Sequence, residues 1–394
     1  MHIKLTHLIT VYLPVLFIDL ALSSIYTNSS FYSNHLKLTP TFVGILMAVS
    51  TASFTCLAIP CGKLADRVDR RRMLYTACLV LAGISLVLPY CKNKILLLIT
   101  FPLLGISLAL FWPAYEAWLS EQESKSKLIQ RVTLFNLFWS IGVTLGPSLS
   151  SYLYQDENPF RPFYIAAGLS LFTIALLYLH KSEVKSLPTK AATDNVEILF
   201  PTPKVRTIHL NIARCANFAS WFGLGVLRRL SPKLILEMGI SPKLFGNYML
   251  TLGGVQTFAF LGLGSGFSTR WHYRLSPILI VQGLAMLSFL MIWKFQHTIL
   301  WTCAFAIIGL SAAFTYFSSI YYGLHRHTDK GNKSGWHEAV LGLGILVGPL
   351  FGGIATDAGW GLQSPYLLCA LTFFTAIIVE AIIAAKLHTS KDLL

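Results

Sequence analysis

The sequence contains 394 residues, of which 54% are hydrophobic and only 12% are charged. Soluble domains carry about 25% charged residues, so this composition excludes a soluble enzyme and a disordered chain. The formal net charge of +14 indicates either an anionic partner or a membrane topology signal, and the placement of the basic residues decides between them.

Apolar runs recur along the whole chain, and each is long enough to cross a bilayer as a helix of about 20 residues. They predict twelve transmembrane helices, at 6–28, 41–61, 73–91, 95–119, 131–154, 161–180, 207–228, 243–263, 275–294, 297–323, 334–356 and 365–386. An even number of spans places both termini on the same side of the membrane.

The basic residues gather on one side of this arrangement. The two termini and the loops on their side hold 21 Lys and Arg, against 9 on the other side and one, Arg214, inside a span. The positive-inside rule therefore predicts a multi-pass protein of the cell (inner or plasma) membrane with both termini in the cytosol. The run Arg70-Arg71-Arg72 is then a topology signal, and we expect no nucleic-acid partner. The expected partners are the lipid bilayer and a small-molecule substrate, with the protein a monomer.

An internal repeat relates the two halves of the chain. Residues 202 positions apart match at Pro40 and Pro242, Gly44 and Gly246, Gly62 and Gly264, Gly142 and Gly344, Gly146 and Gly348, Pro147 and Pro349, and Tyr164 and Tyr366. The halves align without a gap, which indicates duplication of a six-helix unit. The predicted fold is an all-α membrane protein of two pseudo-symmetric six-helix bundles, 1–180 and 207–394, joined by a cytosolic linker at 181–206.

This organisation leaves little room for a soluble catalytic domain, and the sequence has no phosphate-binding GxxxxGK[ST] loop. We expect no enzyme activity, no metal and no cofactor, with energy supplied by a proton gradient or another ion gradient.

The loop between the second and third spans reads GKLADRVDRR, from Gly62 to Arg71. It resembles the G-x-L-x-D-R-x-G-R-R/K signature of the major facilitator superfamily, with Asp69 where that family usually has Gly. A glycine permits close helix contact, an acid satisfies a helix N-terminus, and arginines stay at the cytosolic face. The resemblance implies a twelve-span transporter in which this motif latches the two bundles on the cytosolic side. The latch residues it implies are Gly62, Asp66, Arg67, Arg70 and Arg71. The acid of the motif would lie near the start of the eleventh span, where Ser334 is a candidate N-cap.

Small residues also repeat within the fifth and eleventh spans, where they form a helix-packing ridge. The fifth span has Gly142, Gly146 and Pro147, which resemble the GxxxGP motif of many antiporters of the superfamily, and the eleventh has Gly344, Gly348 and Pro349. Glycines four residues apart let two helix backbones touch, so tight packing explains the pattern equally well.

Asp19 interrupts the first span and is the candidate proton-coupling residue. An ionisable group inside a membrane span is costly and usually has a partner or a functional role. A carboxyl in low-dielectric surroundings favours its neutral form, so it can load and release protons near neutral pH. The Phe17-Ile18-Asp19 segment also resembles the first helix of drug:proton antiporters. The alternative is a hydrogen-bonded structural Asp.

Further residues are candidates for the wall of a substrate cavity. The aromatic and polar ones are Tyr26, Trp112, Tyr115, Glu116, Asn217, Trp221, Phe314 and Phe317, which suit a flat, amphiphilic or cationic solute. Arg214 would bind an anionic group, or would instead extend to the cytosolic surface or pair with an acid. Aromatic residues at helical spacing are more often packing residues.

The leading hypothesis is a secondary transporter that exports an amphiphilic compound or metabolite in exchange for protons. The alternative is proton-coupled or facilitated uptake of a small organic anion or a sugar-like solute, which Arg214 favours. A sensor without transport activity is a third hypothesis.

Overall fold

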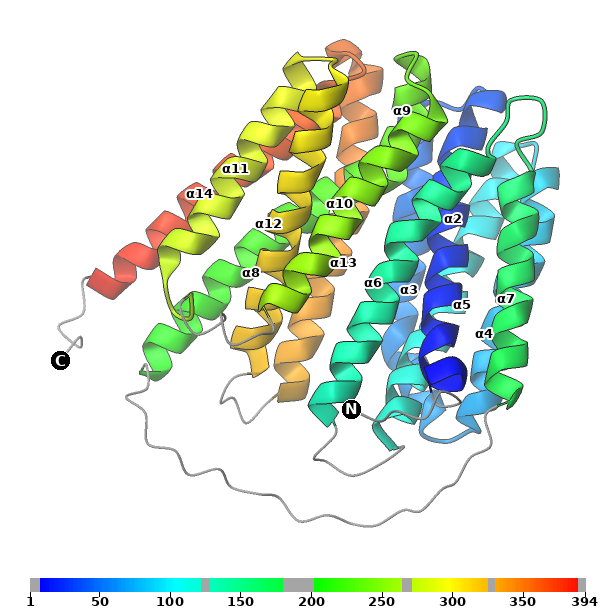
Figure 1. Cartoon of the computed structure of the whole chain (residues 1–394), viewed down its shortest axis with the longest axis horizontal. Helices are drawn as coiled ribbons and strands as arrows, with labels where there is room; N and C mark the ends of the chain where they lie inside the picture. Colours follow the sequence, from blue (N-terminus) through cyan, green and yellow to red (C-terminus); the bar gives the residue numbers. More distant parts are fainter. Residues whose placement is uncertain (1–7, 122–127, 180–201, 264–270, 325–329, 389–394) are drawn as a thin grey trace. The chain divides into compact units, whose positions relative to one another are not determined.

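The computed structural model describes residues 8–121, 128–179, 202–263, 271–324 and 330–388. Within these residues, the twelve long helices are α2 (Leu13–His35), α3 (Pro40–Ala65), α4 (Arg70–Val87), α5 (Lys94–Glu121), α6 (Leu128–Leu153), α7 (Arg161–Leu179), α8 (Pro203–Gly225), α10 (Pro242–Leu263), α11 (Leu275–Lys294), α12 (Thr298–Leu324), α13 (Lys330–Ala355) and α14 (Ser364–His388). The short elements are η1 (Leu8–Tyr12), η2 (Leu88–Tyr90), η4 (Val226–Leu230), α9 (Ser231–Glu237) and η6 (Thr356–Trp360). The all-α membrane fold predicted from the sequence is confirmed (Figure 1).

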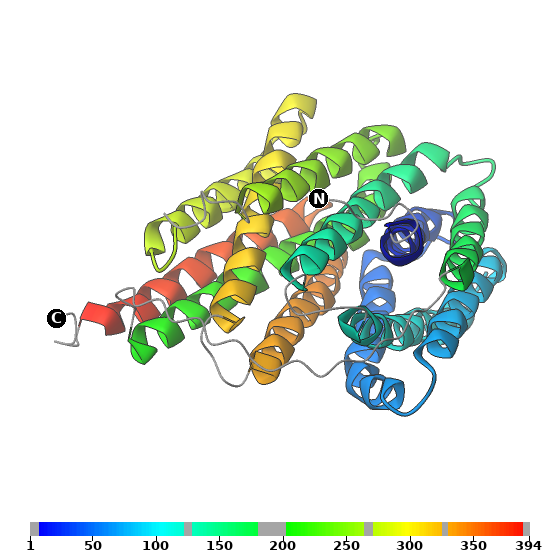
Figure 2. The ribbon, with the colours of Figure 1, turned by 60° about the horizontal axis from the view of Figure 1, so that its bottom comes forward.

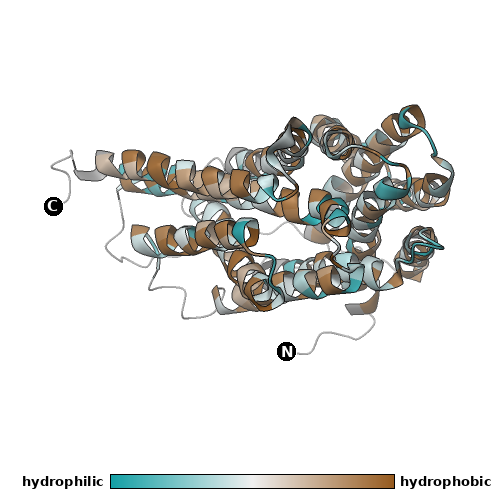
Figure 3. Ribbon diagram, turned by 90° about the horizontal axis from the view of Figure 1, so that it is seen from above, coloured by the Kyte–Doolittle hydropathy of each residue, from teal (hydrophilic) through white to brown (hydrophobic). Residues whose placement is uncertain are grey.

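In the described part of the chain, nine helices are both long enough and apolar enough to cross a membrane. The three other long helices are α6, α8 and α10. Hydrophobic residues recur along the helices, with hydrophilic residues between them (Figure 3).

Most predicted helix boundaries agree with the structure within a turn, and two differ more. The first span was predicted to end at residue 28, but α2 continues to His35. The last two turns of α2 contain buried polar residues, among them Asn28, Ser30 and Ser33. A hydropathy pattern ends the predicted span too early here, because the polar residues at the end of α2 are packed inside the protein. The seventh span was predicted to end at residue 228. In the structure, α8 is followed directly by η4 and α9, so helical structure continues from Pro203 to Glu237.

Two further boundary predictions were wrong. The predicted linker ran from 181 to 206; its residues 181–201 lie outside the described residues, but α8 already begins at Pro203, with Thr202 as its N-cap. Ser334 was expected to cap the eleventh span, whereas α13 begins at Lys330 and residue 334 lies inside the helix. The polar sequence before residue 334 suppressed the hydropathy signal there.

The chain divides into two compact units, each described by itself. Unit 1 comprises residues 1–36 and 49–198, and unit 2 comprises residues 37–48 and 199–394. The first turns of α3 belong to unit 2, in which the backbone N–H of Thr41 donates to Asp357 Oδ2 at 2.9 Å.

The helices of the two units pack in the same order. In unit 1, α2 packs against α6 and α7, and α4 packs against α5 and α7 (Figure 2). In unit 2, α8 packs against α13 and α14, and α11 packs against α12 and α14. Each pair of unit 1 has its counterpart in unit 2, which is what duplication of one helical bundle produces.

The offset between the units is not constant, which corrects the prediction of a gapless alignment. A Cβ on Gly105 of α5 would clash with the carbonyl oxygen of Ser50, and a Cβ on Gly309 of α12 would clash with that of Leu252. The two glycines are two positions further apart in the sequence than Ser50 and Leu252 are. The second half therefore has two extra residues before α12, and Tyr316 replaces Phe314 as the counterpart of Trp112.

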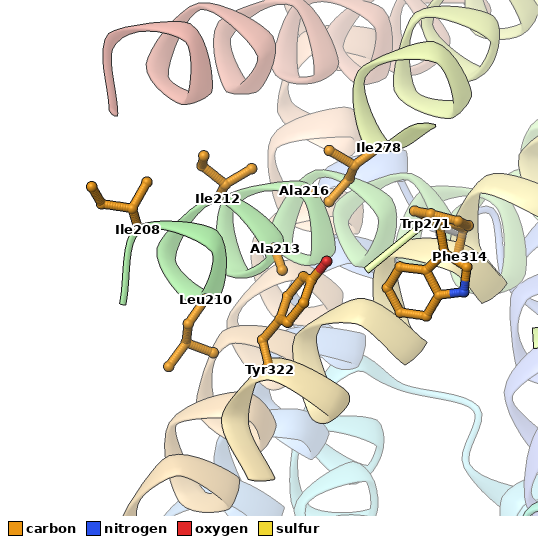
Figure 4. Packing of buried hydrophobic residues seen from close by; sticks show 9 residues of the cluster. All are labelled: Ile208, Leu210, Ile212, Ala213, Ala216, Trp271, Ile278, Phe314 and Tyr322. Carbon is orange, nitrogen blue, oxygen red and sulfur yellow. The ribbon is translucent and has the colours of Figure 1, made fainter. Parts of the chain in front are cut away.

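A hydrophobic cluster holds α8, α11 and α12 of unit 2 together (Figure 4). Figure 4 shows residues from more than one face of α8, together with Ile278 of α11 and two aromatic residues of α12, Phe314 and Tyr322. Trp271 precedes α11, and its ring centroid lies 5.2 Å from that of Phe314. Aromatic contacts at this spacing add to the stabilisation from burial, so the cluster positions the segment that leads into α11.

Candidate functional site

Asp19 lies in α2 of unit 1 and is shielded from solvent, with an exposed fraction of 4%. It faces α6, because a Cβ on Gly142 would lie 2.9 Å from the Cβ of Asp19. The hydroxyl of Ser23, one turn further along α2, donates to the backbone carbonyl of Asp19. The structure therefore places the candidate carboxyl at the contact between two helices of one unit.

The predicted glycine ridge makes this contact possible. A Cβ on Gly142 would also lie 2.5 Å from the carbonyl oxygen of Leu16, and one on Gly146 would lie 2.8 Å from that of Leu20. These are backbone atoms, which cannot move aside as a side chain end can. The glycines of α6 thus allow α2 and α6 to touch along their backbones.

The same contacts occur in unit 2. A Cβ on Gly344 of α13 would lie 3.0 Å from the carbonyl oxygen of Phe218, and one on Gly348 would clash with that of Phe222. Phe218 and Phe222 are the counterparts of Leu16 and Leu20 at the offset that relates the glycines. Pro147 and Pro349 lie inside α6 and α13, one residue after the second glycine of each ridge. The ridge residues of both units therefore make helix contacts.

An aromatic cluster in unit 2 centres on Tyr316, which the sequence analysis missed. Its ring centroid lies 6.0 Å from Trp221 of α8, 5.6 Å from Phe260 of α10 and 4.9 Å from His337 of α13. The His337 Nδ1 is 2.9 Å from the hydroxyl of Ser319. Four helices of unit 2 thus converge on one tyrosine, and the corrected offset would have identified it from Trp112.

Two polar side chains of α8 face the interior of unit 2 near this cluster. Asn217 is fully buried and Trp221 nearly so, and they lie one helical turn apart. Neither the side-chain amide of Asn217 nor the indole N–H of Trp221 has a hydrogen-bond partner within the described residues. Buried polar groups usually have a partner, so this turn of α8 is suited to bind a water molecule or a polar group of a solute.

Phe314 and Phe317 do not join Trp221, although the sequence analysis grouped them with it. Phe314 belongs to the hydrophobic cluster of Figure 4, and both rings pack against Trp271, at 5.2 Å and 6.0 Å between centroids. Phe314 and Phe317 were chosen because they lie 202 positions after Trp112 and Tyr115. In α12 the offset between the two units is two positions larger, so these phenylalanines are not the true counterparts.

The candidates of unit 1 make mostly internal contacts. The hydroxyl of Tyr26 lies 2.7 Å from that of Ser50, and the fully buried Tyr115 donates its hydroxyl hydrogen to the backbone carbonyl of Val11. Trp112 is half-buried and packs edge-on against Phe135 at 5.9 Å. Glu116, near the end of α5, has an exposed side chain.

Arg214 borders an apolar groove within unit 2. The groove has a volume of about 690 Å³ and is lined by α8, α13, η6 and α14. Its lining includes Phe218, Phe351, Leu371 and Val379, and Arg214 is its one charged lining residue among those described. An apolar groove with a cation at its edge fits a hydrocarbon chain that ends in an anionic group.

The helical segment after α8 carries another arginine of unit 2, Arg228, whose side chain contacts α10. Arg228 lies in η4, a π-helical turn, and its guanidinium donates to Gln256 Oε1 of α10 at 2.8 Å. The sequence analysis placed it at the end of a span and named only Arg214 as a basic residue inside one.

The motif between α3 and α4 forms a polar hollow in unit 1. Its volume is about 320 Å³, and it is lined by Ala65, Asp66, Val68, Asp69, Arg70, Arg71 and Trp118. Arg70 lies 3.6 Å from Asp66 and also donates to the carbonyl of Ala65, while Arg67 is exposed. The pairing of Asp66 with the eleventh span stays a prediction.

Two residues of the motif act differently from their expected roles. Asp69, which replaces the family's glycine, is the N-cap of α4, because its Oδ1 accepts from the N–H of Arg71 at 3.0 Å. A Cβ on Gly62 would lie 3.7 Å from the Cβ of Pro113, an ordinary van der Waals distance. Close helix contact therefore does not require a glycine at position 62.

The sequence model of the Major Facilitator Superfamily matches residues 11–334. The chain belongs to this superfamily. It is 25% identical over 358 residues to the uncharacterized MFS-type transporter YqjV of Bacillus subtilis strain 168, a match that covers 85% of this chain and 82% of YqjV. It is 24% identical over 199 residues to the uncharacterized MFS-type transporter YdeE of Escherichia coli K12, which is 50% of this chain and 48% of YdeE. The matched stretch thus spans about half the length of YdeE.

Solved structures agree with this assignment of the fold. A bacterial homolog of the human lysosomal transporter Spinster, in an inward-facing and unoccupied conformation, has a TM-score of 0.74 at 14% identity, over 98% of this chain and 96% of that one. The nucleoside transporter NupG has a TM-score of 0.65 at 12% identity, over 95% and 98%. The chain is thus a member of this superfamily with the helices of a multi-pass membrane protein.

Proposed function

We propose that the protein exports an amphiphilic compound in exchange for protons and that Asp19 is its coupling residue. The observation that carries the proposal is the burial of this carboxyl inside a membrane-spanning helix, at the backbone contact of α2 with α6. A carboxyl so placed is costly unless it has a function or a neutralising partner. A proton is the simplest neutralising ligand.

The polar turn of α8 and the cluster around Tyr316 are the proposed contacts for the solute. Asn217 would hydrogen-bond a polar group, while Trp221 and Tyr316 would pack against an apolar or aromatic part. This combination of contacts suits an amphiphile.

The second candidate function is uptake of a small organic anion, and it rests on the basic residues of unit 2. Arg214 borders the apolar groove and Arg228 reaches Gln256. Guanidinium groups bind carboxylate and phosphate groups in two-bond geometry, so an anionic solute would give them a role.

The test is proton movement evoked by solutes in inverted membrane vesicles with a preformed pH gradient. Lipophilic cations and small organic anions are compared with the wild type, with Asp19→Asn and with Asp156→Asn as a control. Asp156 is a carboxylate that is 81% exposed outside the helices, so its loss should leave coupling unchanged.

Export coupled through Asp19 predicts that amphiphilic cations dissipate the gradient with the wild type and Asp156→Asn but not with Asp19→Asn. Asp19→Asn should still allow downhill movement of the solute. A response to anions alone, or an Asp19→Asn response equal to that of the wild type, would refute the exporter and direct attention to Arg214.

A further inference from the structure

A buried acid and a buried amide meet between two helices of unit 2. Glu380 lies in α14 and Gln282 in α11, both within membrane-spanning segments, and their exposed fractions are 1% and 0%. The Nε2 of Gln282 donates to Glu380 Oε2 at 2.7 Å. The sequence analysis named neither residue, although the criterion that selected Asp19, an ionisable group inside an apolar span, also applies to Glu380 in the predicted span 365–386.

The second oxygen of each group has no hydrogen bond. Glu380 Oε1 and Gln282 Oε1 are both buried, and neither has a partner within the described residues. An amide oxygen and the oxygen of an ionised carboxylate both only accept. An ionised Glu380 would therefore leave two buried acceptors unsatisfied next to an uncompensated charge, and such groups are rare in folded proteins.

One proton removes all three difficulties. A proton on Glu380 Oε1 can be donated to Gln282 Oε1, while Gln282 Nε2 continues to donate to Glu380 Oε2. The two planar groups are then joined by two hydrogen bonds, as in a pair formed by a carboxylic acid and an amide. The negative charge disappears and both oxygens are satisfied.

The surroundings of the pair favour a neutral acid. Among the described residues, the hydrogen-bond partner of the Glu380 carboxyl is the amide of Gln282 in α11, and the thiol of Cys215 in α8 lies near it. Arg214 is adjacent to Cys215 in α8 and lines the apolar groove. The next turn of α14, at Ile383, packs against the hydrophobic cluster of Figure 4.

We propose that Glu380 is a second proton-binding site of the protein and that Gln282 is its positioning residue. The ligand of the site is a proton, held on Oε1 at neutral pH by the bond to the amide oxygen. Loss of this proton would leave a carboxylate with one donor between α11 and α14, which favours separation of these helices and entry of water. The proposal concerns unit 2 alone and does not depend on the coupling role of Asp19.

Infrared spectroscopy of the purified protein in lipid vesicles tests the proposal without a transport measurement. At pH 7 the wild type should show the C=O stretching band of a buried protonated carboxyl, shifted in D₂O. The band should be missing in Glu380→Gln and retained in the control Glu157→Gln, which removes an exposed carboxylate. Gln282→Leu should keep the band but move it to higher frequency, because the hydrogen bonds to the amide are lost.

Glu380→Gln should fold, because two amides can form the same pair of hydrogen bonds. Labelling of the wild type with the apolar reagent dicyclohexylcarbodiimide provides a second measurement, since it modifies protonated carboxyls. Mass spectrometry should locate the modification at Glu380, with less modification as the pH rises.

Three results would overturn the proposal. They are identical wild-type and Glu380→Gln spectra at pH 7, absence of labelling at Glu380, and a band that vanishes when sodium replaces choline in the buffer. The last result would assign the two oxygens to a sodium ion. Because none of these measurements uses a substrate, failure of the export proposal in the vesicle assay would be distinguishable from failure here.

Discussion

The contact between α2 and α6 allows a quantitative prediction for Gly142→Ala. The added Cβ would lie 2.5 Å from the carbonyl oxygen of Leu16 and 2.9 Å from the Cβ of Asp19. Non-bonded heavy atoms prefer about 3.5–4.0 Å, so the two helices would have to separate by roughly 1 Å. Overpacking of this kind costs about 1–3 kcal/mol.

The control is Gly168→Ala in α7, where a Cβ would have no neighbour within 4 Å. Both substitutions gain the same helix propensity, about 1 kcal/mol, so their difference isolates the steric cost. A difference of about 2 kcal/mol corresponds to roughly 6 °C in Tm for a unit of this size. Thermal unfolding of the purified variants, followed by tryptophan fluorescence, measures it. A Tm for Gly142→Ala equal to or above that of Gly168→Ala would refute the reasoning.

Three smaller predictions use the same thermal assay. Asp69→Ala should lower the free energy of unfolding by about 1 kcal/mol because α4 loses its N-cap, whereas Asp69→Gly, which restores the family's residue, should cost only about 0.3 kcal/mol; equal losses would contradict the capping role. Gly62→Ala should raise Tm about as much as Gly168→Ala does, since it gains the same helix propensity and its Cβ would meet Pro113 at an ordinary 3.7 Å; a drop in Tm would show a closer contact than the structure has. Thr315→Val should cost about 1 kcal/mol because Thr315 Oγ1 donates to Ser220 Oγ at 2.8 Å between α12 and α8, whereas Thr302→Val, which removes only a bond to the preceding turn of its own helix, should be neutral; similar values for both would argue against the bond to Ser220.

The internal repeat of 202 residues correctly paired the glycines of the two units but gave the wrong aromatic counterpart in α12. Glycine pairs such as Gly142 and Gly344 align at one common offset because they pack against equivalent backbone positions in α2 and α8. Two residues inserted before α12 break that register, but the pattern contains few matches there to reveal it. The candidate Phe314 was therefore chosen in place of Tyr316.

Buried polar residues were the other source of error. Asp19 and Glu380 are both ionisable residues inside apolar runs, and the sequence analysis selected only Asp19. Glu380 and Gln282 are separated by 98 positions and carry meaning only as a pair. No local pattern links them, because their contact depends on how α11 and α14 pack.

The sequence by itself determined the membrane location, the succession of helices, the duplication and the family. These properties follow from hydrophobic length and from short motifs, which are local along the chain. Only the tertiary structure decided which polar groups meet, such as Glu380 with Gln282, and which aromatic residues share a cluster, such as Tyr316 with Trp221. The physical reason is that a helix presents each side chain in a direction set by its rotation and depth, and contacts with neighbouring helices fix both.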